Sequence, residues 1–228
     1  MGAILEERKL VYPESDGKPM GETWYHVRAM LELHPVLEDF FRDRPDVFIA
    51  TDMFWYFEEG VTKSTAPDLM VIPGVGNHPR RSFFTWKEEG AVPAVIFEMA
   101  SKGTWREDFG EKFDLYEARG VREYFIFDPE AKYIRPRLQG FRLGPKGYRR
   151  IKAVAGSLPC ELGFGVRPEG SMLRLIDPTT GQPIPTRSEK ADEESRRAED
   201  EKRRADTLEA EVARLTALLK SQSTGSTP

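Results

Sequence analysis

Two short apolar runs constrain the fold of this chain more than any other feature of its sequence. They are PDLMVI (residues 67–72) and AVIFEMA (residues 94–100), and proline and glycine lie close to both. Apolar runs of this length are typical of strands that are buried on both faces, at the centre of a sheet with helices packed on it. The sequence therefore predicts an α/β (α+β) core in which these two strands are central.

The segment from residue 94 to residue 128 predicts a strand, a helix and a second strand. The helix spans residues 106–119 and ends at Gly120, which suits the C-cap of a helix. The second strand is EYFIFD, residues 123–128. This order predicts a parallel pair of strands joined by a right-handed crossover. Short strand patterns between residues 132 and 176 predict an antiparallel extension that completes the core.

The residues before this core predict two helices and a hairpin. Residues 23–34 have apolar side chains at helical spacing behind a capping Thr23, and Pro35 is expected to open a second helical stretch. The apolar face of the first helix would consist of Trp24, Val27, Met30 and Leu31. The segments VFIATD and MFWYFEEG (residues 47–60) predict two strands joined in a tight hairpin.

The C-terminal part of the chain differs sharply in composition from the rest. Residues 177–186 are rich in proline, threonine and glycine, which predicts a linker. Beyond them Ala191, Ala198, Ala205, Val212 and Leu219 lie seven residues apart, which predicts a coiled coil. A solvated single helix is the alternative, because alanine and glutamate pack weakly in such a seam. We expect a globular domain over residues 1–185, a coiled-coil helix over residues 186–222 and a disordered end over residues 223–228.

The composition restricts the class of protein and its cellular setting. The chain is 39% hydrophobic, has a formal net charge of −4 and contains one cysteine, so it suits a globular protein without a disulfide framework. The N-terminus has no signal-peptide pattern, and no apolar run is long enough to span a bilayer. We therefore expect a cytoplasmic protein that does not enter a membrane.

Each of the two central strands carries a single acid, Asp68 in the first and Glu98 in the second. A charged carboxylate in an apolar strand costs several kcal/mol unless a partner offsets its desolvation, and two such groups on adjacent strands repel one another. A divalent cation between them would remove both costs. The alternative is structural: Asp68 belongs to a Pro-Asp turn, and Glu98 pairs with an arginine or caps a backbone group.

Several segments, in this order, resemble the Uma-two family of restriction endonucleases, which belongs to the PD-(D/E)XK nuclease superfamily. They are PDLMVI, VIFEMASKGT, REDFGEKFDLYEARGVREYFIFDP and LQGFRL, within a resemblance that spans roughly residues 10–185. The resemblance implies a restriction-endonuclease-like fold, with a mixed sheet core flanked by helices. It also implies a divalent metal cofactor, Mg²⁺ or Mn²⁺, and DNA as the substrate.

The resemblance further implies roles for individual residues. The strand aspartate of the superfamily corresponds to Asp68 and its D/E position to Glu98, so both would bind the metal ion. Ala100 occupies the position, two residues after the acid, at which the superfamily has its lysine. Lys112 on the following helix is the expected substitute, and Lys102 is the alternative. Lys112 is favoured because a helix positions an ammonium group more rigidly than a loop.

Three more polar residues near these positions are candidates for supporting roles. Glu22 would either add an acid to the site or favour the N-terminus of its helix. Ser101 would donate a hydrogen bond near the metal-binding acids or cap a turn. Asp108 would support the site from behind or cap the helix that follows.

The histidines and a basic loop have open assignments. His26 could face the site or the core. His78, Arg80 and Arg81 lie in the loop between the two central strands. They would bind phosphates of the DNA backbone, or else pair with the acids of their own loop.

These observations favour a metal-dependent endonuclease that cuts DNA. A homo-oligomer, with a dimer favoured, is expected because two DNA strands require two sites and a coiled coil pairs protomers. One alternative is a catalytically inactive nuclease fold that binds nucleic acid or protein through the coiled coil. Another is a metal-dependent phosphoesterase with a different substrate.

Overall fold

The computed structural model describes residues 10–13 and 22–224, with side chains up to residue 219. The chain divides into two compact units, residues 1–184 and residues 185–228. Among the described residues, no helix combines the length and the apolar character that crossing a membrane requires.

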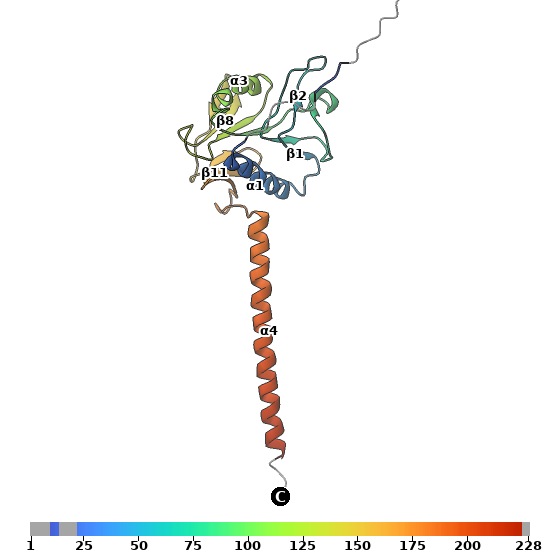
Figure 1. Ribbon diagram of the computed structural model, residues 1–228, viewed down its shortest axis with the longest axis vertical. Helices are drawn as coiled ribbons and strands as arrows, with labels where there is room; N and C mark the ends of the chain where they lie inside the picture. The colour runs from blue at the N-terminus through green and yellow to red at the C-terminus, as the bar shows by residue number, and fades with distance from the viewer. Residues whose placement is uncertain (1–9, 14–21, 225–228) are drawn as a thin grey trace, which may run out of the picture. The chain divides into compact units, whose positions relative to one another are not determined.

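The first unit is built on a six-stranded sheet with the strand order β1-β4-β6-β7-β8-β9 (Figure 1). The pair β6–β7 is parallel, and the other neighbouring pairs are antiparallel. The strands are β1 (Val47–Thr51), β4 (Leu69–Pro73), β6 (Val95–Met99), β7 (Glu123–Phe127), β8 (Leu138–Gly144) and β9 (Gly147–Arg150). The predicted central positions of β4 and β6, and the predicted parallel pairing after β6, are confirmed.

Helices and smaller sheets cover both faces of this sheet. Phe97 and Phe125 point to the face covered by α1 (Trp24–Phe40) and by a sheet of β10 (Leu158–Cys160), β11 (Phe164–Glu169) and β12 (Met172–Ile176). Ile96 and Ile126 point to the opposite face. That face is covered by α3 (Glu111–Ala118) and by a sheet of β2 (Trp55–Tyr56), β3 (Ser64–Thr65) and β5 (Phe83–Phe84). Figure 1 shows α1 and α3 on opposite sides of the sheet.

Helix α1 differs from the prediction at Pro35, which lies inside one continuous helix rather than at the start of a second one. The predicted cap is confirmed, because the Thr23 hydroxyl accepts a hydrogen bond from the His26 amide at 3.3 Å. Most of the predicted apolar face is wrong, since Trp24, Val27 and Leu31 are exposed and only Met30 of the four is buried. The buried face is Ala29, Met30, Leu33, Val36 and Leu37. Its packing on the sheet continues past Pro35 and so outweighs the loss of one helical hydrogen bond.

The single helix predicted over residues 106–119 is two helices, α2 (Trp105–Asp108) and α3. Gly110 separates them with a backbone conformation of φ −118° and ψ −106°, which is not helical. Gly120 ends α3 with φ +79°, as expected for a residue at the end of a helix. The break places Lys112 in the first turn of α3.

The hairpin predicted over residues 47–60 is wrong. Strand β1 pairs with β4 in the central sheet, whereas β2 pairs with β3 and β5 in a separate sheet. Asp52 lies between them with φ +47°, in the left-handed region. Strand β4, whose residues 69–72 are buried, provides β1 with an apolar partner that a local hairpin would not.

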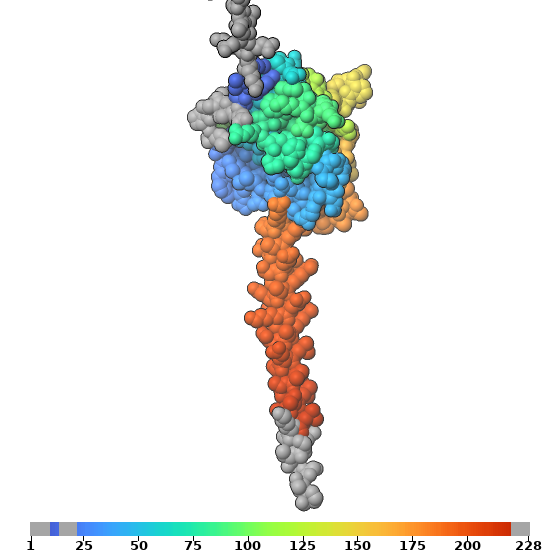
Figure 2. All heavy atoms as spheres, turned by 90° about the vertical axis from the view of Figure 1, so that its right-hand side faces the viewer, coloured from blue at the N-terminus to red at the C-terminus, as the bar shows by residue number. Residues whose placement is uncertain are grey.

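The antiparallel extension is confirmed for β8 and β9, which form a hairpin at one edge of the central sheet. Figure 2 shows the yellow part of the chain, around residue 145, projecting from the surface of this unit. Strands β10–β12, in the same predicted extension, form a separate antiparallel sheet that packs on the core. The short helix η1 (Thr85–Lys87) and α2 complete the first unit.

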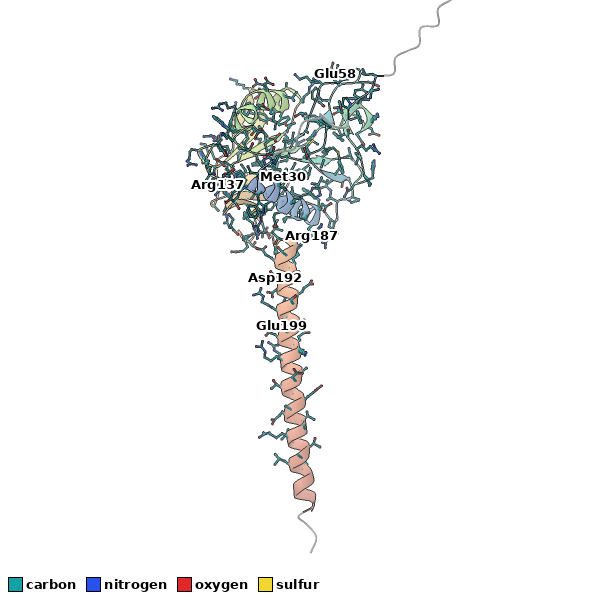
Figure 3. All side chains as sticks on the ribbon, viewed as in Figure 1. Met30, Glu58, Arg137, Arg187, Asp192 and Glu199 are labelled. Atoms are coloured by element: carbon teal, nitrogen blue, oxygen red, sulfur yellow. The ribbon has the colours of Figure 1, made fainter. Side chains whose placement is uncertain are left out.

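The second unit is one helix, α4 (Arg187–Thr224). Thr186 begins it with a capping box, in which its hydroxyl accepts from the Glu189 amide at 3.2 Å and its amide donates to the Glu189 carboxylate at 2.8 Å. The large apolar side chains Leu208, Val212, Leu215 and Leu219 are exposed. Charged side chains such as Asp192 and Glu199 project from the helix (Figure 3). Of the predicted disordered end, residues 223–224 belong to α4, and residues 225–228 lie outside the described residues.

Candidate active site

The two acids of the central strands face each other across an antiparallel pair. Leu69 of β4 pairs with Phe97 of β6, so continuing this register by one residue places Asp68 opposite Glu98. The Met99 amide donates a hydrogen bond to Oδ2 of Asp68 at 2.6 Å, which fixes that carboxylate against the end of β6. Because side chains alternate along a strand, both acids lie on the face that α3 covers.

Glu98 is a buried carboxyl group held by two donors from α3. Its side chain is 1% exposed. Oε1 accepts from the Tyr116 hydroxyl at 2.7 Å, and Oε2 accepts from the Lys112 ammonium at 2.9 Å. Burial raises the pKa of Glu98 to about 8, since the opposing effect of Lys112 is smaller and the charges of Asp68 and Asp108 add to the rise.

Lys112 lies between two buried acids. Its ammonium is 2.9 Å from Glu98 and 3.2 Å from Oδ1 of Asp108. Burial acts to lower the pKa of Lys112, but the charges of Glu98, Asp108 and Asp68 raise it above its usual range, so the ammonium stays charged at neutral pH. Lys102, the alternative lysine, is exposed and has no polar contact within the described structure. The geometry thus brings Lys112 to the acids, while its catalytic role stays a prediction.

Asp108 is fully buried at the end of α2. This position excludes the helix N-cap considered for it. Neither of its carboxylate oxygens has a hydrogen bond of good geometry among the described residues, although Lys112 lies within ion-pair distance. Burial raises the pKa of Asp108 to about 6 against the influence of Lys112. Asp108 therefore adds negative charge next to the ammonium group of Lys112.

His26 of α1 contacts the second carboxylate oxygen of Asp68. Its Nε2 lies 3.2 Å from Oδ1 of Asp68, and its ring is almost fully buried. Burial acts to lower the pKa of His26, but the hydrogen bond and the charge of Asp68 outweigh it and raise the pKa. Glu22 lies beside the ring, with its carboxylate 3.3 Å from Nδ1. Glu22 thus contacts the residue that holds Asp68.

Two other residues near the site have different outcomes. Ser101 interacts with Thr104, since its amide donates to the Thr104 hydroxyl at 3.2 Å and the two hydroxyls are 3.0 Å apart. It therefore stabilises the turn after β6, the alternative considered for it.

Tyr116 was not singled out from the sequence. Its position, four residues after Lys112 on one helix, is the signal that could have indicated it.

The basic loop between β4 and β6 is arranged around Arg80. Its guanidinium donates to the Glu88 carboxylate at 2.8 Å and to the carbonyl oxygens of Gly76 and His78 at 2.8 and 3.0 Å. It also stacks over the ring of Phe48. Arg80 is thus engaged within its own loop, whereas His78 and Arg81 are exposed.

The donors at this site suit a hydrated, oxygen-binding divalent cation. Lys112 contacts Glu98 and Asp108, His26 contacts Asp68, and the strand register places Asp68 opposite Glu98. Each oxygen of Asp68 and Glu98 has one hydrogen-bond partner and keeps a lone pair for a metal ion. No group of three or more His, Cys, Asp or Glu side chains is arranged as a metal cage in the described part of the chain. Two carboxylates with several waters match Mg²⁺ rather than a structural zinc ion.

Comparisons with known proteins give a family match and a similar solved structure. The model of the Uma2 family, described as "Putative restriction endonuclease", matches residues 5–166. The crystal structure of "a putative nuclease belonging to DUF820" from Anabaena variabilis ATCC 29413 is similar with a TM-score of 0.47 and 15% sequence identity, over 67% of this chain and 86% of that chain. None of the curated proteins matches the chain.

Proposed function

Because the chain belongs to the Uma2 family, we propose that it is a metal-dependent endonuclease that hydrolyses phosphodiester bonds in DNA. One observation carries the proposal. Asp68 and Glu98 face each other on adjacent strands, and the ammonium of Lys112 lies 2.9 Å from Glu98. Two carboxylates that can hold a cation and one fixed positive charge form a set of groups suited to metal-assisted hydrolysis of a phosphodiester by water.

Asp68 and Glu98 would hold the metal ion. A Mg²⁺ or Mn²⁺ ion there would lower the pKa of water and polarise the phosphate. Lys112, charged and held between Glu98 and Asp108, orients the attacking water or offsets the charge that develops on the phosphate oxygens. No residue of the chain needs to form a covalent bond to the substrate.

The remaining contacts keep these groups in position. The Met99 amide and His26 fix the two oxygens of Asp68, while the Tyr116 hydroxyl fixes Oε1 of Glu98. Carboxylates restrained in this way lose little freedom when they bind a cation, so the site is preorganised.

A nicking assay tests the proposal. Supercoiled plasmid is incubated with Mg²⁺ or Mn²⁺ and with the wild-type protein, Asp68→Asn, Glu98→Gln or the control Glu59→Gln, which changes an exposed acid. We expect Asp68→Asn and Glu98→Gln to reduce the nicking rate by about a hundredfold or more, the scale of losing an electrostatic contact to the transition state. The control should cut at the wild-type rate.

Equal nicking by all four proteins would contradict the assignment of the site. A wild-type protein that binds duplex DNA but leaves the plasmid intact with both ions would be a DNA-binding module with a nuclease fold instead of an enzyme.

We also propose that α4 pairs two copies of the chain as a coiled coil. The proposal is supported by the exposure of Leu208, Val212, Leu215 and Leu219, which follow a heptad spacing. Deleting residues 187–228 should convert a dimer to a monomer when the mass is measured in solution by light scattering. An unchanged mass would exclude this role of the helix.

A further inference from the structure

One segment of the chain has a charge opposite to that of the whole. Residues 131–160 contain eight lysines and arginines and no aspartate or glutamate, although the formal net charge of the chain is −4. The basic side chains are Lys132, Arg135, Arg137, Arg142, Lys146, Arg149, Arg150 and Lys152. Positive charge concentrated in this way attracts polyanions even in an acidic protein, because the field near a surface depends on the local charges.

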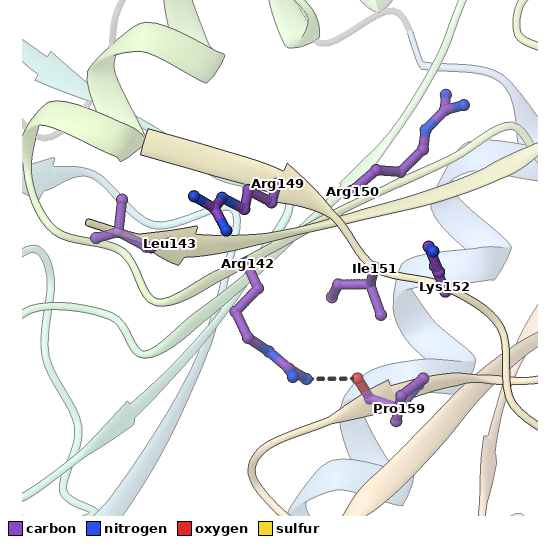
Figure 4. Close-up of a pocket in the computed structure, with 8 residues that line it drawn as sticks. Arg142, Leu143, Arg149, Arg150, Ile151, Lys152 and Pro159 are labelled. Atoms are coloured by element: carbon purple, nitrogen blue, oxygen red, sulfur yellow. Dashed lines mark hydrogen bonds between the residues drawn. The ribbon is translucent and has the colours of Figure 1, made fainter. Parts of the chain in front are cut away.

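Four of these residues line one pocket on the β8–β9 hairpin. They are Arg142, Arg149, Arg150 and Lys152, and Figure 4 shows their side chains around Ile151 and Pro159. Strand β9 is one of the two edge strands of the central sheet. The basic side chains therefore lie where a large partner has access to them.

Most of the positive charge on this hairpin is not neutralised. Arg142 is paired with Glu123 and Glu161, and it donates to the carbonyl of Pro159 at 2.9 Å. Arg149, Arg150 and Lys152 are exposed, and no carboxylate in the described structure forms an ion pair with them. We refer to these three residues as the basic edge.

Arg150 lies on the face of the sheet that carries the candidate active site. Its register partner is Phe141, which packs against Phe113 of α3, and its guanidinium donates a hydrogen bond to Gln139. Gln139 in turn pairs with Ile126, and Ile126 pairs with Glu98. One row of register partners thus runs across the sheet from Glu98 to the residue that Arg150 contacts.

The distance along this row suits a nucleic acid backbone. Strands in a sheet are about 4.8 Å apart, so β9 lies roughly 14 Å from β6. A duplex advances about 3.4 Å for each phosphate of one strand. Arg150 is therefore about four nucleotide steps away from Glu98. Arg149 pairs with Arg142 and points to the opposite face, so the basic edge borders the active-site face through Arg150.

We propose that the basic edge binds the sugar-phosphate backbone of duplex DNA beside the bond to be cut. The inference rests on the proposed function for the identity of the polyanion. Exposed arginine and lysine side chains bind phosphates without regard to base sequence, so the basic edge contributes affinity and register rather than specificity.

Binding is measured without divalent ions, so that cleavage does not interfere. Fluorescence anisotropy with two labelled duplexes of unrelated sequence compares the full-length wild-type protein with Arg149→Gln/Arg150→Gln/Lys152→Gln. The matched control is Lys202→Gln/Arg203→Gln/Arg204→Gln on α4, which removes the same positive charge from exposed positions. Circular dichroism and thermal unfolding check that all three proteins are folded.

The expected result is a loss of affinity of about tenfold or more for both duplexes in the basic-edge variant only. For this variant, the slope of the logarithm of the association constant against the logarithm of the salt concentration should also be smaller in magnitude by about 2 to 3. The reason is that each lost phosphate contact removes nearly one released counterion. Equal weakening in the control variant would overturn the proposal, since net charge alone would explain it. Unchanged binding would also overturn it, and would leave the basic edge as a device that keeps an edge strand from pairing with other chains.

The nicking assay separates this proposal from the proposed function. Suppose that the wild-type protein binds DNA without cutting it and that the basic-edge variant loses binding. This result supports DNA binding by the basic edge and refutes the proposed nuclease activity. If the basic-edge variant keeps both the wild-type affinity and the wild-type cutting rate, the result supports the proposed nuclease activity and refutes DNA binding by the basic edge. A wild-type protein that neither binds nor cuts DNA refutes both.

Discussion

Glu98 makes the metal-free protein sensitive to pH. Burial raises its pKa from the usual 4.5 to about 8 in the folded state. A group whose pKa is higher when folded stabilises the fold below its unfolded pKa, and this stability is lost as the pH rises through the folded pKa. We therefore expect the free energy of unfolding of the metal-free protein to fall between pH 4.5 and pH 8. The substitution Glu98→Gln should remove this fall.

The size of the effect follows from the two pKa values. Each pH unit between them is worth about 1.4 kcal/mol, so the fall between about pH 5 and pH 8 is about 3 to 4 kcal/mol at most. With the side chain 1% exposed, solvent screening reduces this little. Lys112 remains charged throughout, and the pKa of Asp108, about 6, adds a fall that wild type and variant share.

The variant keeps most of the local hydrogen bonds. In Glu98→Gln the new carboxamide oxygen accepts from Lys112, and the new NH₂ group donates to the Tyr116 hydroxyl. That hydroxyl then donates to the Thr65 hydroxyl, which lies 3.3 Å away. The substitution therefore changes the charge with little change in packing.

Urea unfolding in EDTA at about pH 5, 6.5 and 8 measures the effect, with Glu59→Gln as the exposed control. The stability of Glu98→Gln relative to wild type should increase with pH, while the control follows wild type. Adding Mg²⁺ at the highest pH should stabilise wild type more than Glu98→Gln. Parallel pH profiles for wild type and Glu98→Gln would refute the argument that burial raises the pKa of this carboxyl.

Three further predictions concern single residues. Lys112→Met should reduce plasmid nicking by about a hundredfold, while Lys102→Met should not change it; the reverse result would assign the lysine to the loop. His26→Ala should weaken Mg²⁺ binding by about ten- to a hundredfold, as calorimetry would measure, because it removes a contact that orients Asp68; unchanged affinity would make His26 purely structural. Gly140→Ala should destabilise the fold by about 1 to 3 kcal/mol in urea unfolding, since a Cβ there would lie 2.8 Å from the ring of the buried Phe125; a stability equal to wild type would show that the ring moves aside.

The position of the lysine explains how the site departs from the usual motif. Ala100 is almost fully buried, so a lysine at this position would have to carry its charge into the core. Lys112 reaches Glu98 from α3, because Gly110 interrupts the helix just before it. The interruption places the ammonium over the end of β6.

The sequence alone predicted the features that depend on local patterns. The apolar runs around Asp68 and Glu98 predicted β4 and β6, because short continuous apolar runs between proline and glycine are typical of strands buried on both faces of a sheet. Thr23 predicted the start of α1 and Gly120 the end of α3, since both act on backbone groups a few residues away. The two acids were identified in the same way, as charges in segments that are otherwise apolar.

The tertiary structure decided which distant groups meet. His26 reaches Asp68, 42 residues further along the chain, and Arg80 contacts Glu88 instead of remaining available to a ligand. Pro35 lies within a helix because apolar side chains on both sides of it pack on the sheet. Local patterns identified the buried central strands and the ends of helices. The choice of partner depends on packing between segments far apart in sequence, and no local pattern carries that information.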